Sequence, residues 1–310
     1  MGLHNESLGL EELHVAIVGA PYDGSVTAEA GAAEAPDVLR QVSSRGWPHA
    51  EGFVSLRGLK LRDLGDAAVL ESDAEATQRA ITAMVEPIVE AGAVPLVLGG
   101  DHSITSAVVS AFRSRADLGV LWFDSHPDLM DTFGSLRGKA ESRWSHACPL
   151  RRICELPNVR AENVLLLGVR DLIPAELDYI RERDTQVLYA RDLSHLSPEA
   201  VVAAIERKFA AVPEVYISFD IDVLDPAFAP GTGVPIPGGI SSRYLYDVLL
   251  RLFEREQQCR RDSGRHVLRV AGFDVVEIAP PLDVGRMTSL AGMGIIAHVL
   301  GYLALQLGLV

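Results

Sequence analysis

Short apolar runs of strand length recur along the whole chain and alternate with longer helical patterns. Most runs are continuously apolar, which is typical of strands covered on both faces, and regular alternation with helices favours a parallel sheet. The expected strands are Val15–Ala20, Leu59–Asp63, Val94–Gly99, Gly119–Asp124, Val164–Arg170, Gln186–Tyr189, Glu214–Asp220 and Val267–Asp274. The clearest helices are Ala74–Ala91, Ser197–Ala211 and Arg243–Glu256. The pattern predicts an α/β fold, three-layer αβα, with a mostly parallel sheet of about eight strands.

The composition agrees with one large domain and narrows the choice of partners. The chain has 310 residues, of which 48% are hydrophobic, and no linker or repeat divides it, so we expect a single domain over residues 1–310. Its net charge of −14 makes nucleic acid and anionic membranes unfavourable partners. Three unpatterned cysteines and the lack of a secretory signal favour the cytoplasm.

The C-terminal segment Leu290–Val310 needs separate consideration, because it contains no charged residue and is long enough to cross a bilayer. It also contains His298, Gln306 and several glycines. We interpret it as a helix buried in the core or at a subunit interface rather than as a membrane anchor.

Polar side chains stand where four of the apolar runs end. The four sequences are "GGDHS" (99–103), "DSHPD" (124–128), "DIDVLDP" (220–226) and "DVVEIAP" (274–280). In open parallel sheets, ligands bind beyond the carboxyl ends of the strands. These segments are therefore the first candidates for a functional site.

Aspartates and histidines in these segments form a candidate metal site. Its expected ligands are His102, Asp124, His126, Asp128, Asp220 and Asp222. Residues two apart in an extended segment lie on the same side, and unpaired buried carboxylates need a compensating cation. Four aspartates balance two divalent cations, and an oxygen-rich set without thiolates favours manganese over zinc. Asp225, which precedes Pro226, is interpreted as a turn residue that supports the ligands.

Over about Val15 to Val299 the chain resembles the ureohydrolase family, which includes the arginases, agmatinases and guanidino-acid hydrolases. The matching segments are "GAPYDGS" (19–25), "GGDHS", "DSHPD", "WSHACPLRR" (144–152), "GVRD" (168–171), "SFDIDVLDPAFAPGTGVPIPGG" (218–239) and "GFDVVEIAP" (272–280). The resemblance implies an α/β fold around an eight-stranded parallel sheet, a dinuclear manganese site and assembly into trimers or hexamers.

The resemblance also implies roles for individual residues. Asp124 and Asp220 would bridge two Mn²⁺ ions in each subunit, whose shared water has a lowered pKa. Asp128 would orient that water, and Glu277 would bind the guanidinium, whose fork of N–H donors matches a carboxylate. His146 would give a proton to the leaving amine, so that urea and an amine are released.

The substrate is expected to be a small guanidino compound. Arginases use an Asn and an Asp to bind the amino acid head, and Met130 and Ile173 stand at those positions here. Because apolar side chains leave that head unpaired, we favour agmatine or a guanidino acid such as guanidinobutyrate. Pairing of Arg137 or Arg143 with a distal carboxylate would favour the acid. Asp101 argues against formimidoylglutamate, whose hydrolases typically lack it.

Several alternatives stay open at this stage. Arginase or formimidoylglutamase activity is one, and a metal-binding but silent subunit, regulatory or structural, is another. Ala35 and Ala147 replace family glycines and are compatible with the silent form. A phosphoester hydrolase would need basic residues around the metals, where Glu277 has the wrong charge. A Cys148 nucleophile beside His146 would be revealed by loss of activity on replacement with Ala.

Overall fold

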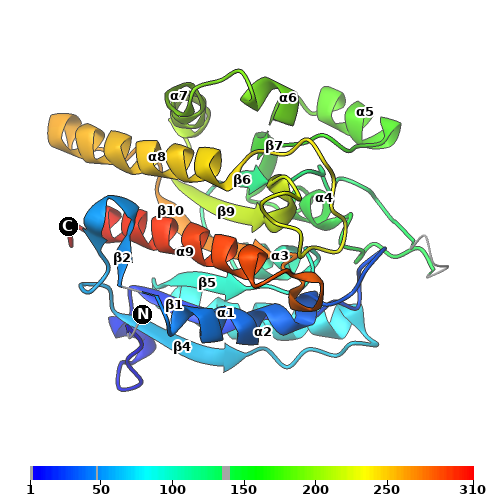
Figure 1. Ribbon diagram of the computed structural model, residues 1–310, viewed down its shortest axis with the longest axis horizontal. Coiled ribbons are helices and arrows are strands. Elements are labelled where there is room, and N and C mark those ends of the chain that lie inside the picture. The colour runs from blue at the N-terminus through cyan, green and yellow to red at the C-terminus, as the bar shows by residue number, and fades with distance from the viewer. Residues whose placement is uncertain (1–2, 47, 135–139) are drawn as a thin grey trace.

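The computed structural model describes residues 3–46, 48–134 and 140–310 and has a central sheet between two helical layers (Figure 1). The strands, in spatial order, are β4 (Leu61–Asp66), β1 (Val15–Gly19), β5 (Val94–Leu98), β10 (Val270–Val276), β9 (Glu214–Asp220), β6 (Leu118–Phe123), β7 (Val159–Leu167) and β8 (Gln186–Leu188). Every pair of neighbours in this sheet is parallel. The predicted three-layer α/β fold with an eight-stranded sheet is therefore confirmed.

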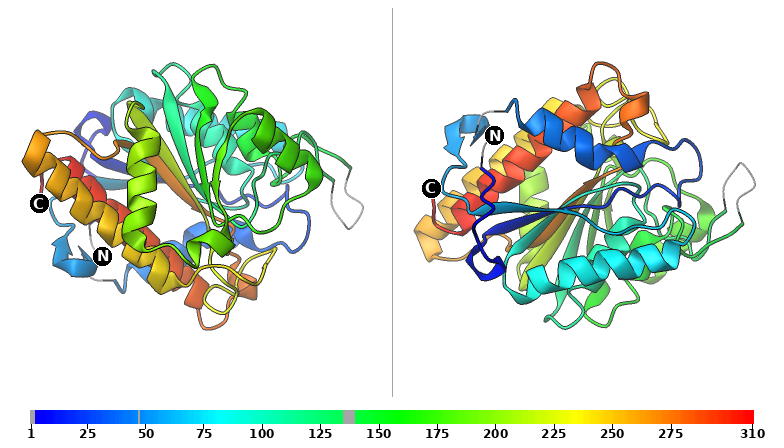
Figure 2. Two further views of the ribbon diagram at one scale, coloured as in Figure 1. Left: turned by 90° about the horizontal axis from the view of Figure 1, so that it is seen from above. Right: turned by 90° about the horizontal axis from the view of Figure 1, so that it is seen from below.

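Helices cover both faces of the sheet (Figure 2). One layer contains α1 (Ala35–Ser43), α7 (Pro198–Phe209), α8 (Ser242–Ser263) and α9 (Met287–Gln306), with the short α6 (Ala190–Leu193). The opposite layer contains α2 (Ala74–Glu90), α3 (Ile104–Ser110), α4 (Pro149–Ile153) and α5 (Pro174–Glu182). A small antiparallel ribbon joins β2 (His49–Ala50) to β3 (Val54–Ser55). Single 3₁₀ turns are η1 (Leu10–Glu12), η2 (Ala32–Glu34), η3 (Glu51–Phe53), η4 (Ile221–Val223) and η5 (Pro280–Leu282).

The core consists of two apolar clusters, one on each face of the sheet. Successive residues of a strand point to opposite faces, so Leu121 packs toward α7 and α8 while Trp122 packs toward α3 and α4. Both residues are fully buried, as is all of β6. This explains why the run Leu118–Phe123 is continuously apolar rather than alternating.

The end of α8 differs from the prediction. Its apolar periodicity stops near Glu256, but the helix continues to Ser263 and ends at Gly264, whose φ of 69° is left-handed. The last turns carry Arg260 and Arg261, and cations are favourable at a helix C-terminus. A polar, solvent-facing extension leaves no hydrophobic pattern, so the prediction of an end at Glu256 was wrong.

Helix α9 covers one face of the sheet. Among the described residues, this one helix is long and apolar enough to cross a membrane by length and composition. It lies between α1 and α8, and 78% of its most apolar window is buried. Burial of Ile295, Leu300 and Leu303 fits the prediction of a core helix.

Candidate active site

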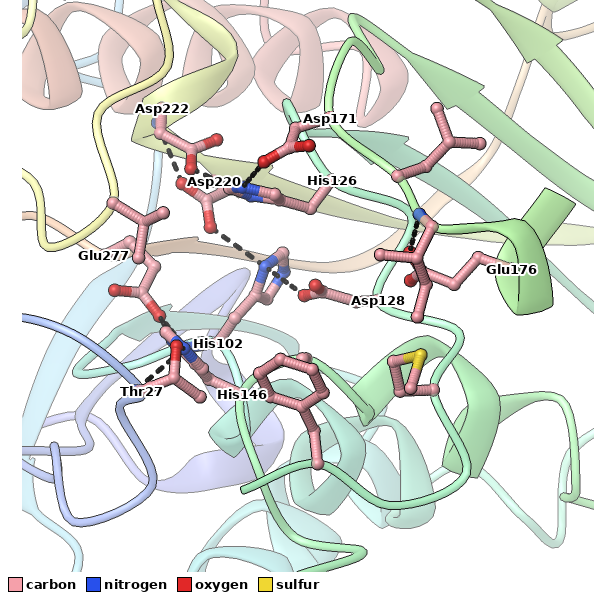
Figure 3. Close-up of a pocket in the computed structure, with 16 residues that line it drawn as sticks. Thr27, His102, His126, Asp128, His146, Asp171, Glu176, Asp220, Asp222 and Glu277 are labelled. Atoms are coloured by element: carbon pink, nitrogen blue, oxygen red, sulfur yellow. Dashed lines mark hydrogen bonds and ion pairs between the residues drawn. The ribbon is translucent and has the colours of Figure 1, made fainter. Parts of the chain in front are cut away.

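The four central strands bring the predicted residues to one edge of the sheet (Figure 3). His102 follows β5, and Glu277 follows β10. Asp220 ends β9, with Asp222 in the following turn, and the "DSHPD" segment follows β6. Because β5, β10, β9 and β6 are consecutive neighbours, segments from distant parts of the chain meet there.

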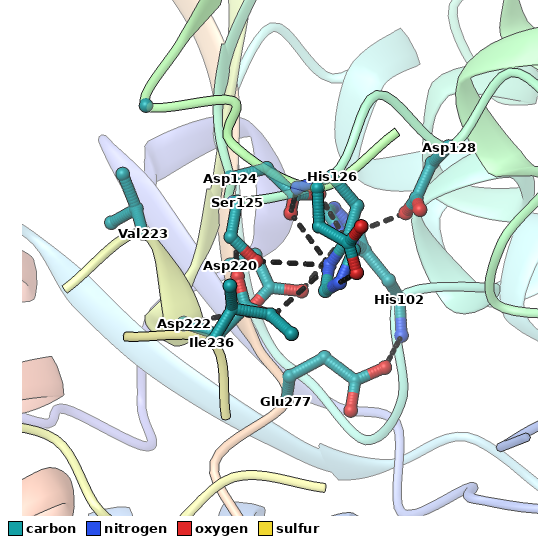
Figure 4. A network of polar contacts seen from close by, with 12 residues as sticks. His102, Asp124, Ser125, His126, Asp128, Asp220, Asp222, Val223, Ile236 and Glu277 are labelled. Atoms are coloured by element: carbon teal, nitrogen blue, oxygen red, sulfur yellow. Dashed lines mark hydrogen bonds and ion pairs between the residues drawn. The ribbon is translucent and has the colours of Figure 1, made fainter. Parts of the chain in front are cut away.

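The first group of candidate metal ligands surrounds His102 (Figure 4). Its Nδ1 lies 3.1 Å from an oxygen of Asp124, 3.1 Å from Asp128 and 3.0 Å from Asp220. This nitrogen is buried and forms no hydrogen bond to any described residue. Three carboxylates and an imidazole that direct lone pairs at one point are a donor set for a cation.

The second group contains Asp124, His126 and Asp222. Nδ1 of His126 lies 3.2 Å from Asp222 and 3.4 Å from Asp124. Asp124 belongs to both groups, with one oxygen toward each histidine, as a bridging carboxylate requires. Asp220, the other expected bridge, lies in the first group but not in the second, and its other oxygen accepts the N–H of Asp222 at 2.8 Å.

Hydrogen bonds behind His102 select its tautomer. The hydroxyl of Ser218 donates to the buried carboxylate of Asp274 at 2.7 Å, so its oxygen is free to accept Nε2–H of His102 at 2.9 Å. The unprotonated Nδ1 then faces the carboxylates, as metal binding needs. The ring also stacks on Trp122, whose Nε1–H donates to Asp124 at 2.9 Å. Trp122 lies within the predicted strand Gly119–Asp124, and no local pattern in the sequence distinguishes this supporting role.

Electrostatics of the cluster also favour bound cations. Burial, together with the charge of Asp124, raises the pKa of Asp128 to about 7. Burial and the charge of Asp222 raise the pKa of Asp220 well above its usual value. Burial alone would lower the pKa of His102, but the surrounding carboxylates raise it well above the ordinary value. The cluster therefore needs positive charge, from protons or metal ions.

Two predicted catalytic residues have strained backbones. Asp128 has φ 53° and Glu277 has φ 61°, in the left-handed region that non-glycine residues rarely adopt. Such conformations cost of order 1–3 kcal/mol and tend to occur where side-chain placement matters for function. The strain is consistent with a site role for both carboxylates.

His146 lies directly against Glu277. Its Nδ1 is 2.8 Å from Oε1 of Glu277, which also accepts the main-chain N–H of His102 at 2.8 Å. Burial would lower the pKa of His146, but the charge of Glu277 raises it. On its other side, Nε2 is 3.0 Å from the N–H of Thr27 and 2.8 Å from its hydroxyl. Thr27 was not singled out from the sequence.

A cavity of about 190 Å³ opens beside these residues. Five of the six predicted ligands line it together with His146 and Glu277: His102, His126, Asp128, Asp220 and Asp222. Asp124, the sixth, is fully buried and is not part of the described wall. The remaining described wall residues are Thr27, Met130, Phe133, Ala147, Asp171, Leu172, Ile173, Glu176 and Val234. Met130 and Ile173 therefore border the cavity, as expected from the sequence. Asp171 and Glu176 were missed as wall residues, although Asp171 belongs to the quoted "GVRD" segment.

The other residues considered in the sequence lie as follows. Arg143 donates to Glu155 at 2.8 Å, away from the cavity wall, and Arg137 lies outside the described residues. Ala35 is fully buried at the start of α1. Cys148 is buried, which raises the pKa of its thiol to about 12 and makes it a poor nucleophile.

Asp225 holds the loop after β9 through its carboxylate. It accepts main-chain N–H groups of Ala227, Gly238 and Gly239 at 2.7–3.2 Å. These contacts agree with its interpretation as a turn residue.

Comparison with known proteins identifies the family. A family model described as the arginase family matches residues 13–301. The chain belongs to the arginase family. Guanidinopropionase of Pseudomonas aeruginosa is 34% identical to this arginase-family chain over 296 residues, which cover 94% of the chain and 87% of the relative. Agmatinase of Bacillus anthracis is 30% identical, with 94% and 92% covered.

Solved structures of family members have the same fold. Proclavaminate amidino hydrolase from Streptomyces clavuligerus matches with a TM-score of 0.81 at 30% identity, covering 94% of this chain and 92% of that one. Arginase from Bacillus subtilis matches with a TM-score of 0.75 at 26% identity, covering 93% and 98%. The named relatives are hydrolases, and this arginase-family chain is accordingly an enzyme of the hydrolase class. Its histidine–aspartate groups are compatible with a metal site.

Proposed function

We propose that this enzyme hydrolyses a small guanidino compound without an amino acid head to urea and an amine, using two Mn²⁺ ions per subunit. The observation that carries the proposal is the placement of Glu277 and His146 against the histidine–aspartate cluster in one cavity. A carboxylate for the guanidinium, a proton donor and a metal ligand set are the three parts that this reaction needs.

The metal ligands would be His102, Asp124, Asp128 and Asp220 on one side and Asp124, His126 and Asp222 on the other. Bound at these residues, two divalent cations would supply a water of lowered pKa, the nucleophile that attack on a guanidinium carbon needs near neutral pH. The unpartnered Nδ1 of His102 and the oxygen-rich donor set support manganese as the metal.

The protein's own residues would bind the substrate and move the protons. The Glu277 carboxylate would accept N–H groups of the guanidinium, with its Oε1 against His146. Asp128, itself one of the proposed ligands, would accept a hydrogen bond from the attacking water. When the C–N bond breaks, the nitrogen keeps the bonding electron pair and takes a proton from His146. The hydroxyl left on the carbon gives its proton to Asp128 as it becomes the carbonyl of urea, so that a neutral amine and urea are the products.

The outer wall of the cavity supports a substrate without the amino acid head. Met130 and Ile173 offer no hydrogen bonds from their side chains, so a zwitterionic head would lose its water without gaining partners. The described wall also contains no arginine or lysine, whereas the Asp171 side chain is 56% exposed at its edge. These features favour a substrate whose end distant from the guanidinium is an amine or is apolar. The similarity to guanidinopropionase keeps a substrate with a carboxylate at that end among the candidates.

The test is urea release by the manganese-loaded enzyme from arginine, agmatine, 4-guanidinobutyrate, 3-guanidinopropionate and formimidoylglutamate. We expect urea from agmatine or a guanidino acid, no activity in Asp128→Asn, and unchanged activity in Cys148→Ala. Urea from arginine would contradict the role of Met130 and Ile173. Bound metal with no product from any compound would support the silent, regulatory or structural alternative.

We also propose that the enzyme is a cytoplasmic homo-oligomer, a trimer or hexamer, without nucleic acid or membrane partners. Its acidic net charge of −14 supports the absence of polyanionic partners. Several large apolar side chains are exposed near the start of α9, which supports a subunit contact: Phe228, Leu282, Val284, Met287 and Leu290. Light scattering coupled to gel filtration would measure the mass, and a monomer would contradict the assembly.

A further inference from the structure

Thr27 offers two different groups to the same nitrogen of His146 (Figure 3). Its main-chain N–H lies 3.0 Å from Nε2, and its hydroxyl oxygen lies 2.8 Å from the same atom. A main-chain N–H can only donate, so it pairs with Nε2 when that nitrogen carries no proton. The hydroxyl oxygen can accept, so it pairs with Nε2 when the ring is protonated.

As the proton donor, the ring gives its Nε2 proton to the leaving amine and later regains it, so it passes through both of these states in each turnover. In the neutral ring, the proton lies on Nδ1 and is directed at Glu277. In the protonated ring, Nε2–H needs an acceptor, or a buried charged group is left with an unsatisfied donor. His146 is only 8% exposed, so water is a poor substitute for that acceptor.

We propose that Thr27 is a positioning residue for His146: its amide holds the ring when neutral, and its hydroxyl holds it when protonated. This inference rests on the proposed role of His146 as the proton donor. Thr27 contacts His146 rather than the predicted metal ligands, so it acts on the reaction through that ring.

The segment that carries Thr27 is anchored independently of its side chain. The N–H of Ser25 donates to the buried Asp101 at 2.9 Å, and the carbonyl of Ser25 accepts the main-chain N–H of His146 at 3.2 Å. These contacts hold the segment against the loop of His146, so a change of the Thr27 side chain should leave both backbones in place.

Other charges that act on the ring come from three strand ends. They are Glu277 after β10, Asp101 after β5 and Asp128 after β6, and each favours the protonated ring. All three are kept in variants of Thr27, so a change in the titration of His146 reports on the hydroxyl.

The matched variants are Thr27→Val, which keeps the shape and the amide but removes the oxygen, and Thr27→Ser, which keeps the oxygen. With the manganese-loaded enzyme, kcat and KM are measured from pH 6 to pH 10 on the substrate found above. For Thr27→Val we expect the alkaline limb of kcat to move about one pH unit lower, a roughly tenfold loss of kcat on that limb, and a KM within about twofold of the parent. For Thr27→Ser, which keeps the hydroxyl, we expect the alkaline limb of kcat at the same pH as in the parent.

A second measurement does not depend on turnover. Nitrogen-15 NMR of histidine-labelled protein, loaded with Mg²⁺ to avoid broadening by Mn²⁺ and assigned with His146→Asn, follows the two ring nitrogens with pH. We expect His146 to lose its second proton about one pH unit lower in Thr27→Val than in the parent or Thr27→Ser. Equal titration in all three proteins, or equal loss in both variants, would overturn the inference. If the parent releases no urea, the proposed function fails, and the NMR titration still decides the role of Thr27.

Discussion

At the scale of single residues, the position of Glu277 is fixed both by side-chain contacts and by its backbone conformation. Its carboxylate accepts the N–H of His102 and lies against Nδ1 of His146, and its own backbone has φ 61°. Burial would raise the pKa of this carboxyl, but the positive field of His146 lowers it. Glu277 is thus kept negative in the site where a guanidinium cation would bind.

We expect Glu277→Gln to lose roughly 100-fold or more in kcat/KM, because a neutral amide cannot compensate the charge of a buried guanidinium. Metal content should not change, since Glu277 belongs to neither candidate metal group. Glu155→Gln is the matched control, because Glu155 lies outside the cavity wall and its side chain is 44% exposed. Steady-state kinetics with metal analysis would measure both, and retention of more than a tenth of the activity would rule out the assigned role.

At the scale of elements, Arg170 connects the segment after β9 to the rim of the cavity. Its guanidinium donates only to main-chain carbonyls among the described residues: Gly168, Asp222, Val223, Leu224 and Ile236, at 2.6–3.3 Å. The fork of N–H groups spans several carbonyls at once, which the single ammonium of a lysine cannot do. Arg170 therefore fixes the turn that carries Asp222.

We expect Arg170→Lys to weaken binding of one metal ion by about 10–100-fold, the usual effect of losing a group that orients a ligand. The measurement is the metal content of each subunit after equilibrium dialysis against graded Mn²⁺. Arg181→Lys, at an exposed position on α5, is the control and should bind metal as the parent does. Identical binding curves for the two variants would show that Arg170 does not position Asp222.

His298 of α9, whose ring stacks on Tyr246 of α8, predicts a pH effect on stability. Nδ1 of His298 bonds the carbonyl of Gly294 at 2.7 Å, and its buried Nε2 has no hydrogen bond to any described residue. Burial lowers the pKa of His298, with opposing contributions from Gly294 and Glu51. The folded protein thus binds this proton less readily than the unfolded chain, whose histidine pKa is about 6.5.

The contribution of the neutral His298 ring to the free energy of unfolding is therefore fully present above about pH 6.5. It is lost as the pH falls from there through the lower pKa of His298 in the folded protein. We expect the difference in free energy of unfolding between the parent and His298→Asn to shrink over that window. Urea denaturation at pH 7.5, 6.5, 5.5 and 5.0 would measure it. A difference that grows on acidification would mean that Glu51 stabilises the protonated ring more than burial disfavours it.

At the scale of the whole molecule, the site joins segments that lie far apart in the chain. His102, Asp124 and Asp220 lie at the ends of three different strands, and His102 and Asp220 are more than one hundred residues apart. Cations that bind these residues only in the folded state would link the central strands and offset the repulsion between buried carboxylates.

We therefore expect removal of metal to lower the thermal midpoint by roughly 5 °C or more, and added Mn²⁺ to restore it in a concentration-dependent way. Differential scanning fluorimetry of chelated and reloaded protein would measure the shift, with Asp128→Asn as a variant expected to respond less. A midpoint that is independent of Mn²⁺ would exclude tight metal binding at these residues.

The sequence by itself determined the layers of this protein and the inner part of its candidate site. Continuous apolar runs such as Leu118–Phe123 indicate strands covered on both faces, and polar residues directly after them indicate the edge at which ligands bind. This information is local, because a strand and its following turn are adjacent in the chain. It was enough to predict that residues such as His102, Asp124 and Asp222 belong to one candidate site.

Only the tertiary structure decided the contacts between distant segments. The sheet order β5-β10-β9-β6 places Glu277 beside His102, and it depends on how the whole chain packs. Thr27 meets His146 across 119 positions, and Trp122 looks like any core aromatic until its ring stacks on His102, which follows another strand. Such contacts come from side chains that converge in space, so they have no periodicity or spacing that a sequence can display.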